Sequence, residues 1–366
     1  MKVAVVYNIS HADLAHYEKT AVPASAELNF EPYFDIEHSS PLDGYTSITR
    51  ALCEAGFDAY SLNIFDDYNA FLKDYRLNRP DVVFNMVEYY NDKPTLEMNF
   101  ACLLQMMDIP YTGAPPMALA ICQRKIMAKS ILASMGINTP KFRVVSHEEE
   151  SKELGLKFPL IVKPSQEDAS LGIEDESVVS NEAQLYERVK FIVNSFKQKA
   201  LVEEYIDGRE LNVAVMGDRS PRVLPISEID FSNMPSHLNN IVSYQAKWDP
   251  YHEAYHMARA ICPSVLPSEV ELKAKELALR AFTALGARDY ARVDMRLSKN
   301  NELFVLEINP NPDLTEDAGF MRSSKAAGYS FRRTLKRIVE MAWSRRVKSP
   351  GEKSAKPDFE FPVRQA

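Results

Sequence analysis

Two apolar stretches near the carboxyl end, YARVDMRLS and ELFVLEINP, carry an unusual set of charged and polar residues. Both read as strands joined by a short turn, so their side chains should alternate between the two faces of a hairpin. Arg292 and Asp294 then share one face of the first strand. Glu307 and Asn309 share the same face of the second. Two carboxylates and an amide oxygen are hard ligands that suit magnesium, whereas the alternative is a surface hairpin with a salt bridge.

Two lysines stand where a phosphate-binding chain would need them. Lys163 ends the apolar stretch PLIVKP, and a lysine at the end of a buried strand is costly unless its ammonium group meets an anion. Lys125 lies on the preceding helical stretch, with Lys129 one turn later. A lone lysine on a helix is also typical of a solvated surface, so Lys163 is the more informative of the two.

A third stretch, ALVEEYIDGRE, combines an apolar strand with a turn. Backbone N–H and C=O groups beside apolar side chains are the usual means of reading an adenine edge. Glu210 could then accept hydrogen bonds from ribose hydroxyls. By itself this pattern has low specificity.

The composition of the 366 residues, 46% hydrophobic and 26% charged, is typical of a globular protein with two or three domains. A formal net charge of -8 argues against a broad surface for nucleic acid or anionic membranes, but it is compatible with a small anionic ligand. The four cysteines are scattered without a C-x-x-C pair, and the N-terminus MKVAVVYNIS lacks a signal-peptide core. We therefore expect a cytoplasmic protein with reduced thiols.

Strand and helix signals divide the chain into units. The stretches KVAVVY, DAYSLNI and DVVFNMV alternate with the helical pattern YTSITRALCEAG, which predicts a parallel α/β domain over residues 1–117. Residues 118–200 predict a small α+β unit, and residues 201–346 predict a second one that contains the hairpin. The tail, residues 347–366, is rich in Lys, Pro and Ser and is predicted to be flexible.

Three finer expectations concern connections and element lengths. A polar, histidine-bearing connection should follow the first strand as far as about Asp43. The stretch MALAICQRKIMAKSILASMGI should form one long amphipathic helix. The stretch PRVLPISEI should form one strand of the third unit.

In chain order, the informative features are the two lysines, the loop to Gly172, EEYI, Glu210, YQAKW, CPS and the charged hairpin. This ordered set resembles the ATP-grasp superfamily, and within it the D-alanine:D-alanine ligase-like group. The resemblance implies an N-terminal parallel α/β domain followed by a two-subdomain ATP-grasp fold, with ATP held between the two subdomains.

The resemblance also implies roles for individual residues. Lys125 and Lys163 would contact the ATP phosphates, and Glu210 would hold the ribose. Leu306 would pack on the adenine base. The adenine hinge would consist of Glu203, Glu204, Tyr205 and Ile206. Two magnesium ions, with manganese as the alternative metal, would be bound by Asp294, Glu307 and Asn309.

The reaction implied by the resemblance activates a carboxylate as an acyl phosphate, which an amine then attacks. The expected partners are therefore a small-molecule carboxylate and a small-molecule amine, such as amino acids or peptide-like compounds. Arg292 would stabilise the oxyanion of the tetrahedral intermediate, Lys247 would reach the transferred phosphoryl group, and Ser170 would lie in the loop over the substrate. A homodimer through the first domain is also in keeping with the resemblance.

The chain departs from this group at the substrate pocket. The Gly-Gly turn and following glutamate of the group are replaced by VVYNISHADL, and the loop over the substrate reads EDASLG. Asp313 stands where the group has the glycine of its turn after the metal-binding asparagine. The substrates therefore need not be D-alanine. Glu88 in FNMVEYYND is our candidate for binding a substrate amine, against the alternative of a capping or solvated glutamate.

The stretch HEAYH, from His252 to His256, matches the zinc-peptidase pattern H-E-x-x-H, which needs both histidines on one face of a helix. No third-ligand extension follows in MARAICPSVLP, so a zinc metallopeptidase is the minor alternative and a mobile loop near the substrate is favoured. A non-catalytic ATP-binding module is the second alternative. Against it, the metal ligands, the lysines and Arg292 are all present together.

Overall fold

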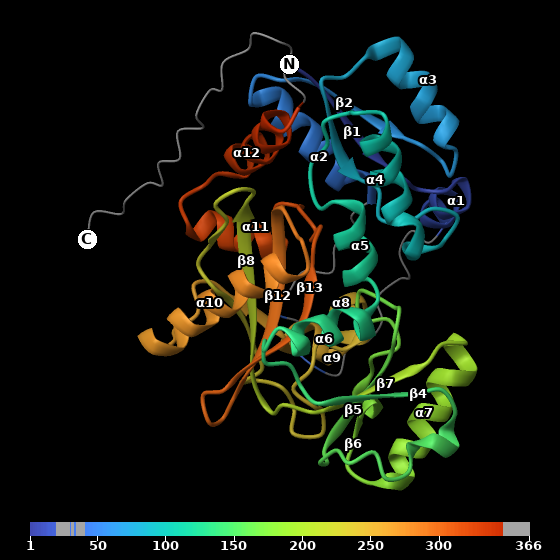
Figure 1. Cartoon of the computed structure of the whole chain (residues 1–366), viewed down its shortest axis with the longest axis vertical. Helices are drawn as coiled ribbons and strands as arrows, with labels where there is room; N and C mark the ends of the chain where they lie inside the picture. The colour runs from blue at the N-terminus through green and yellow to red at the C-terminus, as the bar shows by residue number, and fades with distance from the viewer. Residues whose placement is uncertain (20–29, 31–32, 34–40, 347–366) are drawn as a thin grey trace.

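The structure, a computed structural model, describes residues 1–19, 30, 33 and 41–346. Its strands form three sheets, built from residues 2–86, 142–204 and 208–309 (Figure 1). The tail predicted to be flexible, residues 347–366, lies outside the described residues.

The first sheet is parallel and has the strand order β2-β1-β3. Its strands are β1 (Lys2–Tyr7), β2 (Asp58–Asn63) and β3 (Val82–Met86), as the alternation of strand and helix signals predicts. The run of Val and Ala in β1 is buried, as is typical of a parallel strand covered on both faces. The helix α2 (Pro41–Glu54) leads into β2, and α3 (Tyr68–Asn78) connects β2 to β3.

The connection after β1 begins with a helix, α1 (His11–Lys19), which the sequence analysis did not predict, and most of residues 20–40 lie outside the described part of the chain. Ser10 gives the local reason for the helix. Its Oγ accepts a hydrogen bond from the backbone N–H of Asp13 at 3.1 Å, which caps the first turn.

The single long helix expected from Met117 to Ile137 is two helices, α5 (Pro116–Cys122) and α6 (Lys125–Ser134). The chain leaves the helical conformation at Arg124, with φ -97° and ψ 85°. The backbone N–H of Lys125 then donates to Ser165 O at 3.3 Å rather than to a carbonyl of its own helix. The break makes Lys125 the first residue of α6. The helix before α5 is α4 (Glu97–Met106).

The second sheet is antiparallel with the order β4-β7-β5-β6. Its strands are β4 (Phe142–Val145), β5 (Leu160–Pro164), β6 (Val178–Val179) and β7 (Ala200–Glu204). The helix α7 (Glu182–Phe196) buries Leu185, Val189 and Ile192 against Val162 and Val202 of this sheet. Short 3-10 turns complete the connections, η1 (Pro94–Leu96), η2 (Glu148–Ser151) and η3 (Asp175–Ser177).

The third sheet has the order β11-β10-β8-β12-β13, with β9 paired to β8. The strands are β8 (Gly208–Gly217), β9 (Arg222–Val223), β10 (Ser227–Asp230), β11 (Arg259–Ile261), β12 (Asp289–Ser298) and β13 (Leu303–Asn309). The single strand expected from PRVLPISEI is therefore β9 and β10. Pro225 lies between the two, and a proline has no N–H for a sheet ladder.

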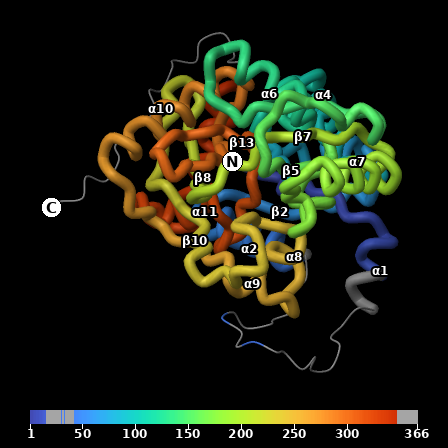
Figure 2. The backbone as a smooth tube through the Cα atoms, turned by 90° about the horizontal axis from the view of Figure 1, so that it is seen from below, coloured from blue at the N-terminus to red at the C-terminus, as the bar shows by residue number. Residues whose placement is uncertain are grey.

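Five helices accompany the third sheet: α8 (Tyr244–Trp248), α9 (Glu253–Met257), α10 (Ser268–Ala284), α11 (Gly319–Ala326) and α12 (Phe331–Ser344). In Figure 1, α12 lies beside α2 of the first unit, at the end of the molecule opposite to the second sheet. Seen from below (Figure 2), β5, β7 and α7 lie on one side and β8 and α10 on the other, with β13 between them.

The main hydrophobic core joins the first and third units. Val5 and Phe84 of the parallel sheet share one buried cluster with Leu335 and Ile338 of α12 and with Met216 of β8. The second sheet has a separate cluster built from residues 145–202. The first and third units are thus held together by shared apolar burial, which is the dominant stabilising term in folding.

Candidate active site

A cavity of about 900 Å³ is lined by residues of the second and third sheets, by their connections and by residues that follow β3 of the first sheet. Thirteen of the fourteen site residues expected from the sequence border this cavity: Lys163, Ser170, Glu203, Glu204, Tyr205, Ile206, Glu210, Lys247, Arg292, Asp294, Leu306, Glu307 and Asn309. Lys125 borders a small adjoining pocket together with Glu307 and Asn309. The expected residues therefore lie around one space, although they are spread over nearly two hundred positions of the sequence.

The β12–β13 hairpin brings its four polar side chains together. In the antiparallel register, Arg292 lies opposite Asn309, and Asp294 lies opposite Glu307. Asn309 Nδ2 donates to Asp294 Oδ2 at 2.9 Å. Arg292 donates from Nε to Asp294 Oδ1 at 2.7 Å and from Nη2 to Oδ2 at 2.8 Å. A bulge follows Asp294, so the register changes only beyond this cluster.

Asn212 of β8 is a member of this cluster that the sequence analysis missed. It lies opposite Asp294 in the sheet, and its Nδ2 donates to Asp294 Oδ1 at 2.8 Å. The sequence could have indicated Asn212, because a buried amide side chain within the apolar run ELNVAVMG needs a polar partner.

The donor set of the hairpin fits a hard divalent cation. Asp294 and Glu307 supply carboxylates, and Asn309 donates through its nitrogen, which leaves Oδ1 as the amide atom suited to a metal. Lys125 Nζ lies 2.6 Å from Glu307 Oε2, and this ammonium group holds the pKa of Glu307 well below its ordinary value in spite of burial. Glu307 is thus kept ionised by a cation of the chain itself.

Glu203 is the centre of a buried ion triad. Its Oε1 lies 2.5 Å from Lys129 Nζ and its Oε2 lies 2.7 Å from Lys163 Nζ, with the Glu203 side chain only 2% exposed. Burial alone would raise the pKa of Glu203, but the two lysines lower it to about 2. The Glu203 side chain therefore orients Lys163. Lys129 also donates to Thr139 Oγ1 at 2.6 Å.

Glu210 lies on the same face of the third sheet as the hairpin cluster. Arg296 Nη2 lies 3.0 Å from Glu210 Oε2, and the two residues are directly paired across β8 and β12. Arg296 was not among the expected site residues. Arg296 lies two positions after Asp294, as Arg292 lies two positions before it, so strand alternation places all three side chains on one face. The sequence therefore contained the pattern that predicts Arg296 at the site.

The loop over the cavity is tied to α8. Ser170 has φ 65°, and its Oγ donates to Val242 O at 2.8 Å. Trp248 Nε1 donates to Ala169 O at 2.8 Å. Lys247 projects from the same short helix, and burial together with the nearby Arg292 guanidinium lowers its pKa. A cation in that position is well placed to be neutralised by an anion in the cavity.

Acidic side chains surround the end of the cavity next to the first sheet. Glu88 follows β3 and is exposed to the cavity. Although the Glu88 carboxyl is open to the cavity, the protein packed around it reduces its solvation and raises its pKa to about 7, with Asp313 and Asp168 adding to the increase and Lys247 opposing it. Glu97, at the start of α4, also borders the cavity, and burial raises its pKa well above the ordinary value.

The HEAYH stretch forms the helix α9 rather than the favoured mobile loop. His252 caps this helix, its Nδ1 accepting from Ala254 N at 3.1 Å. His256 is buried; its Nδ1 accepts from Tyr33 N at 3.1 Å and its Nε2 lies 2.8 Å from Pro250 O. Because both ring nitrogens of the buried His256 are used in these contacts, the geometry does not support a zinc peptidase. Within the described part of the chain, no group of three His, Cys, Asp or Glu side chains could hold a metal ion.

Comparison with known proteins shows the family of the chain. The family model described as the D-ala D-ala ligase C-terminus matches residues 131–340. A D-alanine–D-alanine ligase of Moorella thermoacetica is 31% identical over 317 residues, which is 84% of this chain and 95% of that protein. The chain belongs to the D-alanine–D-alanine ligase family. An uncharacterized protein of Sinorhizobium fredii is also similar, at 34% identity over 72% of this chain and 75% of that protein.

Solved structures of this ligase family share the fold. A D-alanine–D-alanine ligase from Bacillus anthracis superposes with a TM-score of 0.68 at 20% identity, covering 93% of this chain and 97% of that one. The same protein complexed with ATP gives a TM-score of 0.65. The predicted ATP-grasp fold, the resemblance to the D-alanine:D-alanine ligase-like group and the assignment as an ATP-dependent ligase are confirmed. Among the described residues, no helix combines the length and apolar character needed to span a membrane.

Proposed function

We propose that this ligase uses ATP to activate the carboxylate of one small molecule as an acyl phosphate and joins it to the amine of another. The observation that carries the proposal is the convergence of Arg292, Asp294, Glu307 and Asn309 in one cavity with Lys163 and the turn after β7. Phosphoryl transfer depends mainly on positioning and on electrostatic stabilisation, and this arrangement offers both.

The nucleotide side of the cavity lies between the second and third sheets. Lys125 and Lys163 bind the phosphates, each held ready by a carboxylate, Glu307 and Glu203. The backbone from Glu203 to Ile206 reads the adenine edge, Leu306 packs on the base, and Glu210 accepts from the ribose hydroxyls.

The hairpin carboxylates form the metal side of the cavity. Asp294, Glu307 and Asn309 would hold two magnesium ions, with manganese as the alternative metal, because all three offer hard oxygen ligands. A metal bound there would neutralise charge on the phosphate oxygens. Lys125, which is paired with Glu307, would add a further positive charge beside the same phosphates.

The chemical steps use the cations near the hairpin. A carboxylate oxygen of the donor attacks the γ-phosphorus of ATP, ADP leaves, and Lys247 stabilises the transferred phosphoryl group. The amine, after its ammonium group gives one proton to solvent, attacks the carbonyl carbon of the acyl phosphate, and its nitrogen gives a second proton to solvent as the tetrahedral intermediate collapses. Arg292 stabilises the resulting oxyanion through the guanidinium edge not used by Asp294. Phosphate then leaves with the oxygen that bridged carbon and phosphorus. Ser170 keeps the loop closed over these steps.

The acidic end of the cavity selects the amine. Glu88 binds the ammonium group of a substrate, since a cation there offsets the repulsion from Asp313 and Asp168 that raises the Glu88 pKa. Asp313 disfavours a second substrate carboxylate placed beside it. The substrates are therefore amino-acid or peptide-like molecules that need not be D-alanine. A homodimer and a cytoplasmic location stay predictions.

The test is release of phosphate from ATP and magnesium by the purified protein, with a panel of D- and L-amino acids, dipeptides and hydroxy acids. We expect release that requires a particular pair of substrates and a product mass equal to their sum minus water. ATP binding without release for any pair would instead support the non-catalytic module. Peptide cleavage abolished by a chelator would return the zinc alternative.

A further inference from the structure

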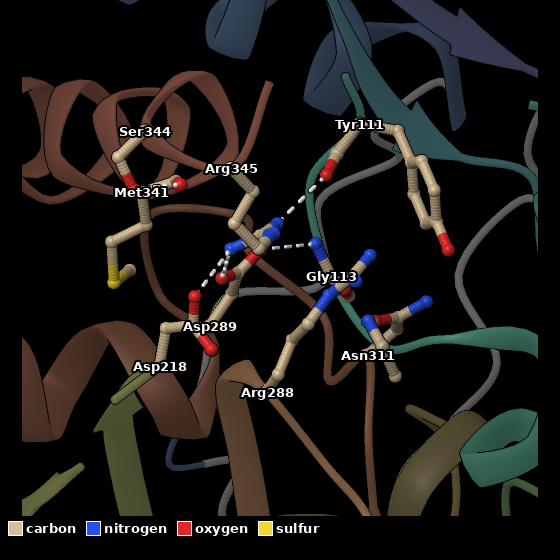
Figure 3. A network of polar contacts seen from close by, with 10 residues as sticks. Tyr111, Gly113, Asp218, Arg288, Asp289, Asn311, Met341, Ser344 and Arg345 are labelled. Atoms are coloured by element: carbon tan, nitrogen blue, oxygen red, sulfur yellow. Dashed lines mark hydrogen bonds and ion pairs between the residues drawn. The ribbon is translucent and has the colours of Figure 1, made fainter. Parts of the chain in front are cut away.

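The linker between α4 and α5, residues 107–115, is clamped by residues of the third unit (Figure 3). Asp289 Oδ2 accepts from Gly113 N at 2.9 Å and from Arg345 Nη2 at 2.6 Å. Arg345 Nη2 also donates to Tyr111 O at 3.0 Å, and Arg288 Nε donates to Gly113 O at 2.9 Å. Backbone groups of the linker are thus bound by side chains from the start of β12, from the residue before it and from the residue that follows α12.

Asn311 belongs to this clamp and also faces the cavity. Its Oδ1 accepts from the linker N–H of Ala114 at 2.9 Å. Its Nδ2 donates to Glu97 Oε1 at 3.2 Å. The other carboxylate oxygen of Glu97 accepts from Gln123 Nε2 at 3.4 Å. One amide side chain therefore joins the loop after β13, the linker and the start of α4.

Close approach to the linker depends on a glycine. A Cβ on Gly113 would lie 2.4 Å from Asn311 Oδ1, well inside van der Waals contact. Gly113 also has φ 90°, a conformation that favours glycine. The linker and the Asn311 side chain are consequently matched to each other in shape as well as in hydrogen bonding.

The connection from Asn311 to the metal ligand Asn309 is short and stiff. Pro310 and Pro312 flank Asn311 in the stretch INPNPDL. Proline fixes its own φ and restricts the residue before it to extended conformations, so Asn309 and Asn311 are both restricted. A displacement of Asn311 is therefore transmitted to Asn309, whose Nδ2 contacts Asp294 Oδ2 at 2.9 Å.

We propose that Asn311 is a positioning residue that holds Asn309 in its metal-binding place by tying the β13 loop to the linker and to Glu97. The proposal rests on the proposed function, because it assumes that Asn309 binds the metal of the metal–ATP complex. Residues outside the ligand set that orient metal ligands typically change metal affinity by about 10- to 100-fold when replaced.

The test first breaks the hydrogen bond between Asn311 and Glu97 and then restores it with donor and acceptor exchanged. Asn311→Asp keeps an acceptor for Ala114 N–H but places a carboxylate against Glu97. In N311D/E97Q the hydrogen bond is restored with donor and acceptor reversed. The readout is the dissociation constant of ATP in full-length protein by titration calorimetry, with magnesium and with EDTA. The ratio of the two constants measures the metal-dependent part of binding.

We expect N311D to reduce the metal-dependent gain in ATP affinity by about 10-fold or more while ATP binding in EDTA stays within about twofold. N311D/E97Q should recover most of the gain. A purely structural role would weaken ATP binding equally in both conditions, so that both dissociation constants would rise together, and it would not produce this recovery. If N311D does not fold, Asn311→Ser, which is too short to reach Glu97, takes its place in the first comparison.

Two results would overturn the inference: an unchanged metal-dependent gain in N311D and N311S, or no recovery in the double variant. A wild-type protein that shows no metal-dependent gain in ATP affinity would instead contradict the proposed function itself. The two failures are therefore distinguishable.

Discussion

Arg292 and Asp294 form a two-bonded ion pair along one strand, with Nε–Oδ1 at 2.7 Å and Nη2–Oδ2 at 2.8 Å. Asn212 and Asn309 donate to the same carboxylate. The residue proposed to bind metal and the residue proposed to stabilise the oxyanion therefore orient each other before any ligand binds. Such preorganisation lowers the reorganisation needed during the reaction.

Replacing Arg292 should separate catalysis from binding. We expect Arg292→Met to lower kcat by about 100- to 1000-fold, the usual effect of removing one oxyanion donor. The dissociation constant of ATP should change little, since the phosphate contacts are assigned to Lys125 and Lys163. Steady-state kinetics and calorimetry check the two parts, and a fully active variant would exclude the proposed role.

The ion triad around Glu203 should be essential for stability. Glu203→Gln leaves the ammonium groups of Lys129 and Lys163 buried without a counter-charge, which we expect to cost about 3–5 kcal/mol of unfolding free energy. Glu204→Gln is the matched control, because an amide oxygen can still accept from Lys157 N. Urea unfolding of the two variants measures the difference, and equal stabilities would contradict the triad.

Glu88 should make stability depend on pH. Its pKa of about 7 lies above the ordinary 4.5, so between these values the folded protein holds more protons than the unfolded chain. Stability contributed by this group therefore falls as the pH rises through that window. The melting temperature of Glu88→Gln relative to wild type should rise from pH 5 to pH 8. A constant difference would show that Glu88 does not titrate as described.

The linker clamp of Figure 3 should stabilise the contact between the first and third units. Asp289 is fully buried, and its loss leaves Arg345 and Gly113 N without their carboxylate partner. We expect Asp289→Ala to cost about 3–5 kcal/mol. Asp218→Ala, which removes a more exposed partner 3.4 Å from Arg345, should cost less than about 1 kcal/mol. A similar loss in both variants would argue against the buried pair.

Local alternation was enough to predict the hairpin cluster. Arg292, Asp294, Glu307 and Asn309 share a face because strand side chains alternate, and the structure brings them together. The same rule covers Arg296 and Asn212, but their partners Glu210 and Asp294 lie across the β8–β12 pairing, which joins segments far apart in the sequence and leaves no local signal.

Other features depend on contacts far apart in the sequence. The break before Lys125 relies on Ser165, and the clamp joins Tyr111 to Arg345, so neither leaves a local pattern. The HEAYH helix was missed although its cap is local, because histidine is an uncommon N-cap residue.

The most direct test of the central claim follows an oxygen atom. With the substrate pair found by the panel, the donor carboxylate is labelled with ¹⁸O and the released phosphate is analysed by mass spectrometry. An acyl phosphate intermediate predicts one ¹⁸O atom transferred to phosphate in each turnover. Formation of the amide product with unlabelled phosphate would contradict the mechanism.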